Sequence, residues 1–362
     1  MIKINRINLN NYRNFSSCNI EFNSNCNIFF GNNGSGKTNI LEAISLISKG
    51  KGFRNDKIIN IIKNNELYFD INAEVEKDTN LYNVKVTSKK INDVHKKILS
   101  LNDEISKDAE SFLYSQLSFI IFLPEMERLF VSSPSKRRDF IDKLIFSENK
   151  NYNRIINNYK KNILERKKIL QLYNSSSDWL STVEKNISEL GIEIYNLRSD
   201  KLDQLTVELK NIELEKEIFQ NIQLSVSDDF LSKNIDIHKY KAILKQNREI
   251  DKKIGGAKIG PHKSDIKVLI KNGINASQLS TGQQKTLVIL FLIAQCNYLT
   301  IKKKLYPILL LDEICSHLDD INRELILGLS KRFGIQIFMT GTHKSLFSFI
   351  STNANFYNIT DI

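Results

Sequence analysis

The chain has few cysteines, and their arrangement suits neither a metal site nor a disulfide framework. Its 362 residues include four, Cys18, Cys26, Cys296 and Cys315. None lies in a C-x-x-C pair, and none has a second candidate ligand nearby. Scattered cysteines of this kind are typical of reduced core thiols in a cytosolic protein. We therefore expect neither a zinc site nor disulfides.

Long apolar segments are also missing. The most apolar run, residues 287–294, is much shorter than the roughly 20 residues that a helix needs to cross a bilayer. The first six residues lack the apolar stretch of a signal peptide. We therefore expect a cytoplasmic protein with no membrane partner.

Acidic residues are outnumbered by basic ones. The chain has 52 Lys and Arg against 41 Asp and Glu, which gives a net charge of +11 and favours a polyanionic partner. The sequence is also rich in Asn, Lys and Ile, as an AT-rich coding sequence would be, so overall basicity is weak evidence. Clustering is stronger evidence, because residues 133–170 hold eleven Lys and Arg against four Asp and Glu.

Among the features that are present, a glycine-rich loop is the most informative. Residues Gly31-Asn32-Asn33-Gly34-Ser35-Gly36-Lys37-Thr38 fit G-x-x-x-x-G-K-[ST], the loop that wraps nucleotide phosphates. Residues 26–30 predict a buried strand before it, and residues 39–47 predict a helix after it. In this order, backbone N–H groups and the helix N-terminus face the phosphates. The loop predicts ATP or GTP binding, with Lys37 reaching the β- and γ-phosphates and Thr38 ligating Mg²⁺.

Two carboxylates follow a second buried strand. Residues 307–311 read Pro-Ile-Leu-Leu-Leu and predict a parallel-type strand that ends at Asp312 and Glu313. Ligands of α/β sheets bind beyond the carboxyl ends of strands, so both acids are expected beside the phosphate loop. Asp312 is a candidate for holding Mg²⁺, and Glu313 is a candidate catalytic residue that polarises the attacking water. Without the phosphate loop, the same pair would be compatible with a solvated acidic turn.

A third candidate motif precedes a long apolar helix expected over residues 286–298. Ser280 fits an N-cap, Gly282 permits close approach to the first turn, and Gln283 follows. A helix start with free N–H groups can bind an anion. Ordinary helix capping explains this motif equally well when it is taken alone.

The basic cluster favours DNA binding through phosphates without base reading. The sequence has no helix-turn-helix, zinc-finger or RRM motif, so we expect salt-sensitive, sequence-independent duplex binding. Arg137 and Arg138 have an alternative role in place of DNA contact, because they can pair with Asp139 or Asp142 or contact the nucleotide. The candidate phosphate contacts are Lys136, Arg137, Arg138, Lys143, Lys160, Lys161, Arg166, Lys167 and Lys168.

The spacing of apolar residues and the content of Gly and Pro predict an α/β protein with three parts. Residues 1–30 and 66–101 alternate between apolar and polar and predict strands, the second group as an antiparallel layer. Between 134 and 248, Gly and Pro are scarce and apolar residues recur every three or four positions, which predicts helices but no long coiled coil. We expect an ATPase head with a mixed sheet, flanking helices and an inserted helical lobe. Its parts are the first ATPase segment 1–130, the helical insertion 131–254 and the second ATPase segment 255–362.

The chain resembles the ABC-type ATPases, because its motifs follow their order: the phosphate loop, Leu279-Ser280-x-Gly282-Gln283, Leu-Leu-Leu-Asp312-Glu313 and Ser316-His-Leu-Asp319. The resemblance implies that the Ser280 motif of one subunit caps the γ-phosphate held by another, so that ATP joins two heads. It also implies that Ser316 and Asp319 belong to the D-loop. His343, by the same resemblance, is the catalytic switch histidine.

Further segments resemble the RecF family of SMC-like ABC-type ATPases, in the family's order and over nearly the whole chain. They are Asn11-Tyr-Arg13-Asn14-Phe15, Gly50-Lys-Gly-Phe53-Arg54, Phe122-Leu-Pro124-Glu125, Pro134-x-x-Arg137-Arg138-x-Phe140-Ile-Asp142 and Gly260-Pro261-His262-Lys263-x-Asp265. The sequence departs from the pattern in two places. Residues 119–123 occupy the region of the Q-loop, where Gln116 lies nearby and is assigned no role. Ala257 stands where this family often has Thr.

The resemblance implies a weak, DNA-stimulated ATPase that acts as a switch. ATP would drive homodimerisation on duplex or gapped DNA, and slow hydrolysis would reopen the dimer. Closure at gaps would help RecO and RecR load the recombinase RecA and would support the SOS response. The alternatives are another SMC-like ABC ATPase of DNA maintenance and a transporter ATPase subunit. In a transporter subunit the signature follows after a far shorter insertion than the more than 240 residues between Thr38 and Ser280.

Overall fold

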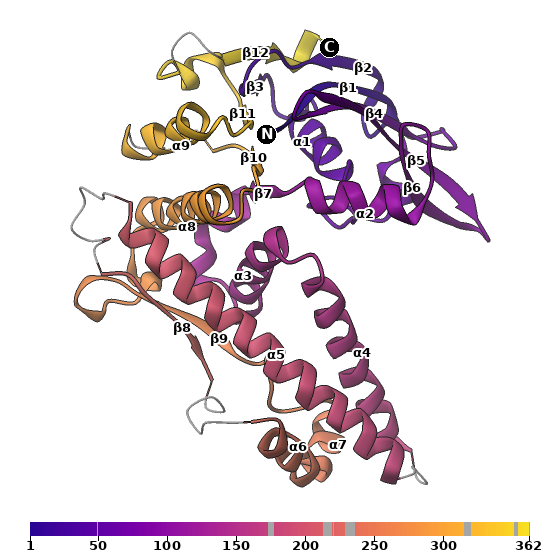
Figure 1. Ribbon diagram of the computed structural model, residues 1–362, viewed down its shortest axis with the longest axis vertical. Coiled ribbons are helices and arrows are strands. Elements are labelled where there is room, and N and C mark those ends of the chain that lie inside the picture. The colour runs from indigo at the N-terminus through magenta and orange to yellow at the C-terminus, as the bar shows by residue number, and fades with distance from the viewer. Residues whose placement is uncertain are drawn as a thin grey trace. The chain divides into compact units, whose positions relative to one another are not determined.

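The computed structural model describes residues 1–48, 50–172, 177–212, 219, 221–228, 236–314, 320–350 and 354–361. They divide into two units, whose elements are labelled in Figure 1. The first unit joins Met1–Glu127 to Lys285–Ile362, and the second is Arg128–Gln284. The sequence places the end of the helical insertion at residue 254, whereas the second unit continues to Gln284. Strands from both sides of residue 254 pair within it.

Alternating apolar residues at the start of the chain build an antiparallel sheet in the first unit. In strand β1, Ile2, Ile4, Ile7 and Leu9 are buried, and a β-bulge between Ile4 and Arg6 accounts for the extra residue in the alternation. The sheet has the order β2-β1-β4-β5-β6. Its strands are β1 Ile2–Tyr12, β2 Phe15–Glu21, β4 Asp70–Lys77, β5 Asn80–Ile91 and β6 Val94–Leu101. The expected antiparallel layer is confirmed, and it also includes β1 and β2.

Apolar runs without alternation form the second sheet of this unit, in the order β12-β3-β11-β10-β7. Every pairing in it is parallel. All four residues of β10 are buried, because parallel sheets are covered on both faces. The strands are β3 Cys26–Phe30, β7 Phe119–Phe122, β10 Ile308–Leu311, β11 Ile337–Gly341 and β12 Ala354–Asn358. Their carboxyl ends therefore meet at one edge, where the segments after β3 and β10 leave the sheet.

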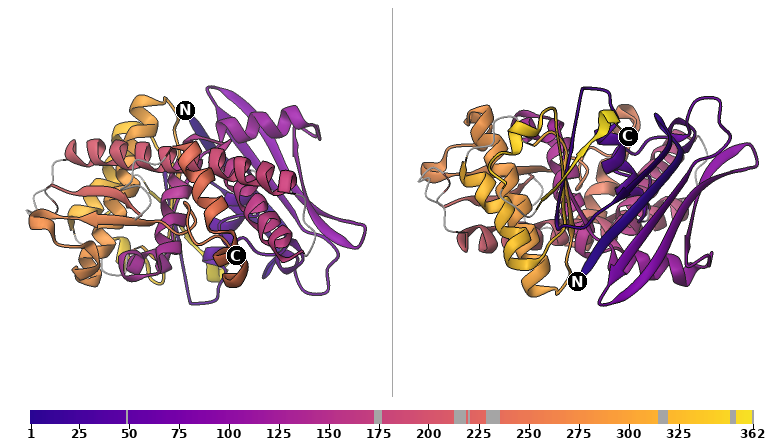
Figure 2. Two further views of the ribbon diagram at one scale, coloured as in Figure 1. Left: turned by 90° about the horizontal axis from the view of Figure 1, so that it is seen from below. Right: turned by 90° about the horizontal axis from the view of Figure 1, so that it is seen from above.

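Helix α1 lies between the two sheets of the first unit, in indigo in the right panel of Figure 2. It contacts β11, and its Glu42 accepts a hydrogen bond from Tyr12 of β1 (3.1 Å). The helices of this unit are α1 Lys37–Leu46, η1 Ile58–Ile61, α2 Lys107–Gln116, α9 Asp320–Phe333, η7 Lys344–Phe347 and η8 Ile359–Asp361. Two helices contain a boundary between the units, η2 Pro124–Val131 and α8 Thr281–Lys302.

Helix α8 is long and apolar enough to cross a membrane, and within the described ranges it alone meets that test. Its most apolar stretch is 83% buried inside the protein. Core helices commonly have this composition, because a helix that is apolar on all sides needs cover on all sides. Its sequence is therefore accounted for by burial within the protein.

The second unit is the helical lobe expected from the sequence. Helices α4 and α5 contact each other, and Figure 1 shows them coming together toward the end of the lobe where α4 ends and α5 begins. Between them the Arg166 side chain is 1% exposed and is bound by Glu184 (3.0 Å) and by Asp251 of α7 (2.7 Å). The elements are α3 Pro134–Glu148, α4 Tyr152–Gln171, α5 Ser177–Lys210, β8 Gln223–Ser227, α6 Ile237–Gln246, α7 Arg248–Ile254, β9 Asp265–Leu269, η5 Lys271–Gly273 and η6 Ala276–Gln278.

A turn at Gly260 packs against tyrosines from two helices of this lobe. The Tyr159 hydroxyl of α4 lies 3.1 Å from the Tyr240 hydroxyl of α6 and 2.7 Å from the His262 ring. Gly260 has a φ of +130°, and a Cβ there would lie 2.1 Å from the Tyr240 hydroxyl. Only glycine fits this position, since any side chain would both strain the backbone and displace the tyrosines.

We expect Gly260→Ala to destabilise the protein by about 2 kcal/mol or more, from the combined strain and overlap. Gly256→Ala is the matched control, because a Cβ there meets nothing within 4 Å and the change should stay within about 0.5 kcal/mol. Urea unfolding followed by circular dichroism measures both. Equal midpoints for the two variants would contradict the packing described at Gly260.

Candidate functional site

The glycine-rich loop follows β3 and leads directly into α1. All three of its glycines have positive φ, Gly31 at +145°, Gly34 at +83° and Gly36 at +108°. Gly36 is the N-cap of α1, and it bears no side chain that could satisfy the first N–H groups of the helix. A Cβ at Gly36 would lie 2.6 Å from the Phe15 ring. The loop is therefore held in a glycine-only conformation that leaves a helix N-terminus open to an anion.

The Lys37 ammonium is held inside this loop. Its Nζ donates to the carbonyl oxygens of Gly31 (2.8 Å) and Asn32 (2.7 Å). Burial lowers the pKa of Lys37, while the charges of Glu313 and Asp312 act in the opposite direction. The Ser35 hydroxyl is buried and has no hydrogen-bond partner among the described residues. The lysine and the unsatisfied hydroxyl both suit a phosphate bound in the loop.

The first of the two carboxylates lies where the sequence predicts it. Thr38 Oγ1 donates to Asp312 Oδ1 at 3.0 Å, although the two residues are 274 positions apart. Thr340 of β11 also donates to Asp312 Oδ1, at 2.7 Å. Burial raises the pKa of Asp312, and the hydrogen bonds from Thr340 and Thr38 lower it in part. Asp312 is thus a buried carboxylate that two hydroxyl groups orient toward the loop.

Glu313, the second carboxylate, is exposed and has an unusual backbone. Its φ is +48°, in the left-handed region that few residues other than glycine adopt. Its N–H donates to Thr340 Oγ1 at 2.8 Å. One threonine therefore contacts both residues of the acidic pair.

The oxygen atoms of Thr38 and Asp312 suit a hard cation such as Mg²⁺. Across the described ranges, no group of three or more His, Cys, Asp or Glu side chains could hold a metal ion. Mg²⁺ is commonly bound by one or two protein oxygens together with nucleotide phosphates and water. The residues present fit an ion that arrives with a nucleotide. Such an ion would offset the negative charge of the nucleotide's phosphates.

Ser280 and Gln283 form a capping box at the start of α8. Ser280 Oγ accepts from the Gln283 N–H (3.3 Å), and Gln283 Oε1 accepts from the Ser280 N–H (3.0 Å). A Cβ at Gly282 would meet nothing within 4 Å, so the first turn is open. The N-cap predicted for Ser280 is present, and the space at Gly282 permits close approach of another group.

The remaining residues assigned by resemblance are placed as follows. His343 is exposed in the loop after β11 and is the N-cap residue of η7. Ser316 and Asp319 lie outside the described residues, as does Cys315. Cys18, Cys26 and Cys296 are buried and form no disulfide, as expected for core thiols.

The basic residues expected to contact DNA separate into two groups. Lys136, Lys160 and Lys161 are exposed. Arg137 instead forms a two-pronged ion pair with Asp265, with both N–O distances 2.7 Å, and Arg138 donates to the Ser264 carbonyl. Burial lowers the pKa of Arg138, and the nearby charge of Arg198 adds to this effect. The structural alternative for these two arginines is therefore favoured, although Arg137 pairs with Asp265 and not with Asp139 or Asp142.

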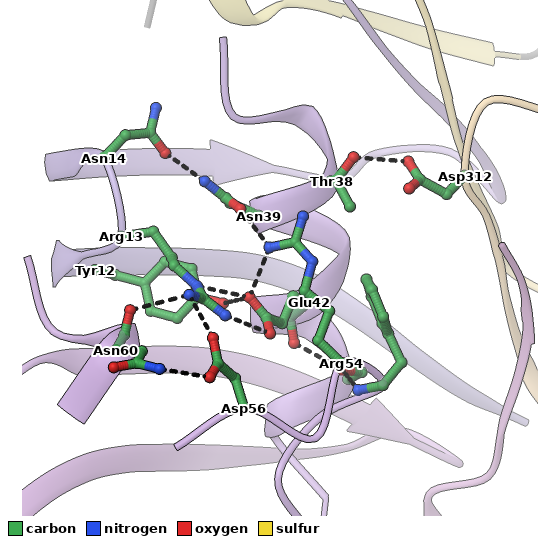
Figure 3. A network of polar contacts seen from close by, with 12 residues as sticks. Tyr12, Arg13, Asn14, Thr38, Asn39, Glu42, Arg54, Asp56, Asn60 and Asp312 are labelled. Carbon is green, nitrogen blue, oxygen red and sulfur yellow. Dashed lines mark hydrogen bonds and ion pairs between the residues drawn. The ribbon is translucent and has the colours of Figure 1, made fainter. Parts of the chain in front are cut away.

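The structure also reveals a buried carboxylate that no sequence motif marks. Glu42 of α1 is fully buried and accepts from Tyr12, from Arg13 through Nε (2.9 Å) and Nη2 (2.8 Å), and from Arg54 (3.2 Å). Figure 3 shows these groups converging on Glu42 from two other segments of the chain. Arg13 further binds Asp56 (3.0 Å). Residues 11–15 and 50–54, quoted above only as family landmarks, thus meet at one buried charge.

A chain of hydrogen bonds links this network to the phosphate loop. Arg54 donates to Asn39 (2.7 Å), Asn39 donates to Asn14 (2.7 Å), and Asn14 donates to the Ser35 carbonyl (3.0 Å). Figure 3 shows Asn14 and Asn39 side by side in this chain. The sequence indicated these contacts only through the polar residues in 11–15 and 50–54, since the residues that bond to one another lie in separate segments.

Comparisons with known proteins agree with this architecture. The AAA domain family matches residues 6–256, more than half of the chain. The DNA replication and repair protein RecF of Rickettsia conorii is 32% identical over 348 residues, which cover 94% of this chain and 95% of that protein. The corresponding protein of Rickettsia typhi is 33% identical over 351 residues, with the same coverage.

Solved structures of RecF are similar to this chain over nearly its whole length. The recombination mediator protein RecF-ATPrS in the RecFOR pathway has a TM-score of 0.81 and 28% identity, covering 95% of this chain and 94% of that one. The structure of RecF-ATP has a TM-score of 0.80 at the same identity and covers 93% of that chain. The Smc head domain of Pyrococcus furiosus, at 16% identity and a TM-score of 0.50, shares the fold alone.

We expect Glu42→Ala to lower the free energy of unfolding by about 3–5 kcal/mol, because it leaves Arg13 without its buried partner. Lys90→Ala is the control, since it breaks the exposed Lys90–Asp93 pair and should cost at most about 1 kcal/mol. Urea unfolding compares the two variants with the unaltered protein. A cost for Glu42→Ala no larger than that of the control would contradict the buried ion pairs described at Glu42.

Proposed function

The chain belongs to the RecF family of DNA replication and repair proteins, and on this premise we propose that it is an ATP-dependent DNA-binding protein of recombinational repair. Solved RecF has been captured as RecF-ATP, and the phosphate loop of this chain has the open helix N-terminus and the buried lysine that such a ligand needs. ATP, bound together with Mg²⁺, is therefore the proposed nucleotide.

The observation that carries the proposal is the meeting of Thr38 and Asp312. Their 3.0 Å contact brings the phosphate loop and the acidic strand end together from positions 274 residues apart. This arrangement is what nucleotide hydrolysis requires, because the cation, the phosphates and the attacking water must share one site. The resemblance to ABC-type ATPases implies that a second copy caps the γ-phosphate, so dimerisation is proposed to complete the site.

We assign the roles in the proposed cycle as follows. Lys37 binds the β- and γ-phosphates, Thr38 and Asp312 hold Mg²⁺, and Glu313 polarises the attacking water. Ser280 of a second copy caps the γ-phosphate through the open start of its helix α8. Ser316, Asp319 and His343 would complete the interface and the site. ATP then favours a closed homodimer, and slow, DNA-stimulated hydrolysis returns it to the open state.

The proposed role in the cell is taken from the family resemblance. Closure on duplex next to a single-stranded gap would assist RecO and RecR in loading RecA and would support replication restart and the SOS response, in the cytoplasm. A transporter ATPase subunit is disfavoured, since the relatives over nearly the whole chain are DNA replication and repair proteins. The Smc head shares the fold only, so it favours no second function.

The exposed face of α4 is the surface proposed for DNA. Arg154, Lys161 and Lys168 are seven residues apart and share one line along the helix, while Lys160 and Lys167 form the adjacent line. All five are exposed. The only acidic residue of α4, Glu165, accepts a hydrogen bond from the Trp179 indole (3.0 Å). Glu165 lies one turn from Lys161 and from Lys168 on this face, so five cations outnumber a single carboxylate, a balance that suits a phosphate backbone.

We predict that ATP strengthens binding to a fluorescent gapped duplex, and that Lys37→Met and Ser280→Arg each abolish the gain. Lys37→Met removes the phosphate contact, and Ser280→Arg blocks the helix start that would face the partner's nucleotide. Fluorescence anisotropy with and without ATP measures both effects. If the unaltered protein binds equally tightly with and without ATP, and both variants bind as tightly, the basic surface alone explains the binding and ATP-driven closure on DNA is contradicted.

We predict that Lys160→Ala combined with Lys161→Ala weakens duplex binding equally for unrelated sequences. The slope of log affinity against log salt should fall by about 2, because two phosphate contacts are lost. Lys89→Ala with Lys90→Ala removes the same charge from exposed positions on β5 and should leave the slope unchanged. Equal effects of both double variants would assign the binding to net charge and not to α4.

A further inference from the structure

Thr340 occupies the centre of the parallel sheet, between the strand of the phosphate loop and the strand of the acidic pair. It is fully buried in β11 and lies opposite Phe29 of β3. On the other side, its neighbour Met339 pairs with Leu311, the last residue of β10. This register brings Thr340 level with Asp312, the residue that follows β10. Nothing in the sequence motifs marks this threonine.

A single hydroxyl of Thr340 serves both members of the acidic pair. It donates its hydrogen to Asp312 Oδ1 (2.7 Å) and accepts the N–H of Glu313 (2.8 Å). A hydroxyl has only one hydrogen to donate, so donation to Asp312 fixes its rotation and directs a lone pair toward Glu313. The two contacts therefore depend on each other.

The second contact is made to a strained residue. Glu313 has a φ of +48°, a conformation that is disfavoured for a residue with a Cβ and persists only when its surroundings impose it. Its N–H is the backbone group that Thr340 holds. The direction of the Glu313 side chain is set by this backbone conformation, and its carboxylate is exposed at the edge of the sheet where the phosphate loop begins.

We propose that Thr340 is a positioning residue for ATP hydrolysis, which holds the backbone of Glu313 in the conformation that aims its carboxylate at the attacking water. The inference rests on the proposed function, because it needs Glu313 to polarise that water. It adds that the acidic pair acts as one unit, since the hydroxyl that orients Asp312 also sets the conformation of Glu313. Thr340 itself contacts neither nucleotide nor water in this role.

The test compares Thr340→Val, which keeps the shape and removes the hydroxyl, with Thr340→Ser, which keeps the hydroxyl. Thr300→Val is the matched control, because Thr300 is also buried in the first unit and its hydroxyl has no hydrogen-bond partner among the described residues. Steady-state hydrolysis gives kcat and KM. Binding of a fluorescent ATP analogue in EDTA and the thermal unfolding midpoint supply two readouts that do not depend on catalysis.

For Thr340→Val we expect kcat to fall at least tenfold, while the affinity for the analogue in EDTA changes less than threefold. Thr340→Ser should restore kcat to within about threefold of the unaltered protein, and Thr300→Val should change neither quantity. A structural role alone would lower the unfolding midpoint without this separation of kcat from binding. If Thr340→Val does not fold, Thr340→Ala removes the same hydroxyl with less bulk and gives the same comparison.

Glu313→Gln separates failure of this inference from failure of the proposed function. If Glu313→Gln abolishes hydrolysis and Thr340→Val keeps the unaltered kcat, the positioning role is overturned and the function stands. If Glu313→Gln hydrolyses ATP at the unaltered rate, the proposed role of Glu313 is wrong and the inference falls with it. Equal loss of kcat in Thr340→Val and Thr340→Ser would also overturn the inference, since the hydroxyl would then not be the group that matters.

Discussion

The parallel register of β3, β11 and β10 is the constraint on which the nucleotide site depends. It pairs Phe30 with Gly341 and Leu311 with Met339, so the phosphate loop and the acidic pair leave the sheet at one edge. Side chains alternate between the faces of a sheet, and a slip of one residue would turn Thr340 away from Asp312. The positions of the phosphate loop, of Asp312 and of Thr340 relative to one another therefore follow from one alignment of strands.

Buried charges have a similar role in both units. Glu42 gathers arginines from two segments that flank the phosphate loop, and Arg166 is held by carboxylates from α5 and α7. Buried ion pairs add little net stability compared with apolar side chains, because both charges lose their hydration. We interpret them as setting geometry, since an arginine with several acceptors permits few arrangements of the segments it joins. In the first unit this geometry supports the phosphate loop, and in the second it supports the helix with the basic face.

The separation of the basic residues shows where reading a sequence is limited. Arg137 and Lys136 are neighbours of like charge in one cluster, yet Lys136 is exposed and Arg137 is bound to Asp265, 128 positions away. No local pattern distinguishes a solvated cation from one that is paired across the fold. The helical spacing of α4 was visible in the sequence, but the burial of Arg166 among its exposed neighbours was not, because it depends on which helices pack against α4.

The sequence by itself determined the strands, the helical lobe, the phosphate loop, the acidic pair and the cap at Ser280. These features depend on interactions between near neighbours: apolar spacing, glycine conformation and side-chain caps within three or four residues. Only the tertiary structure decided that Glu42 gathers Arg13 and Arg54, that Arg137 pairs with Asp265, and that Thr340 joins Asp312 to Glu313. Each of these contacts links segments distant in sequence. Their partners are chosen by strand order and packing, which no local pattern of residues records.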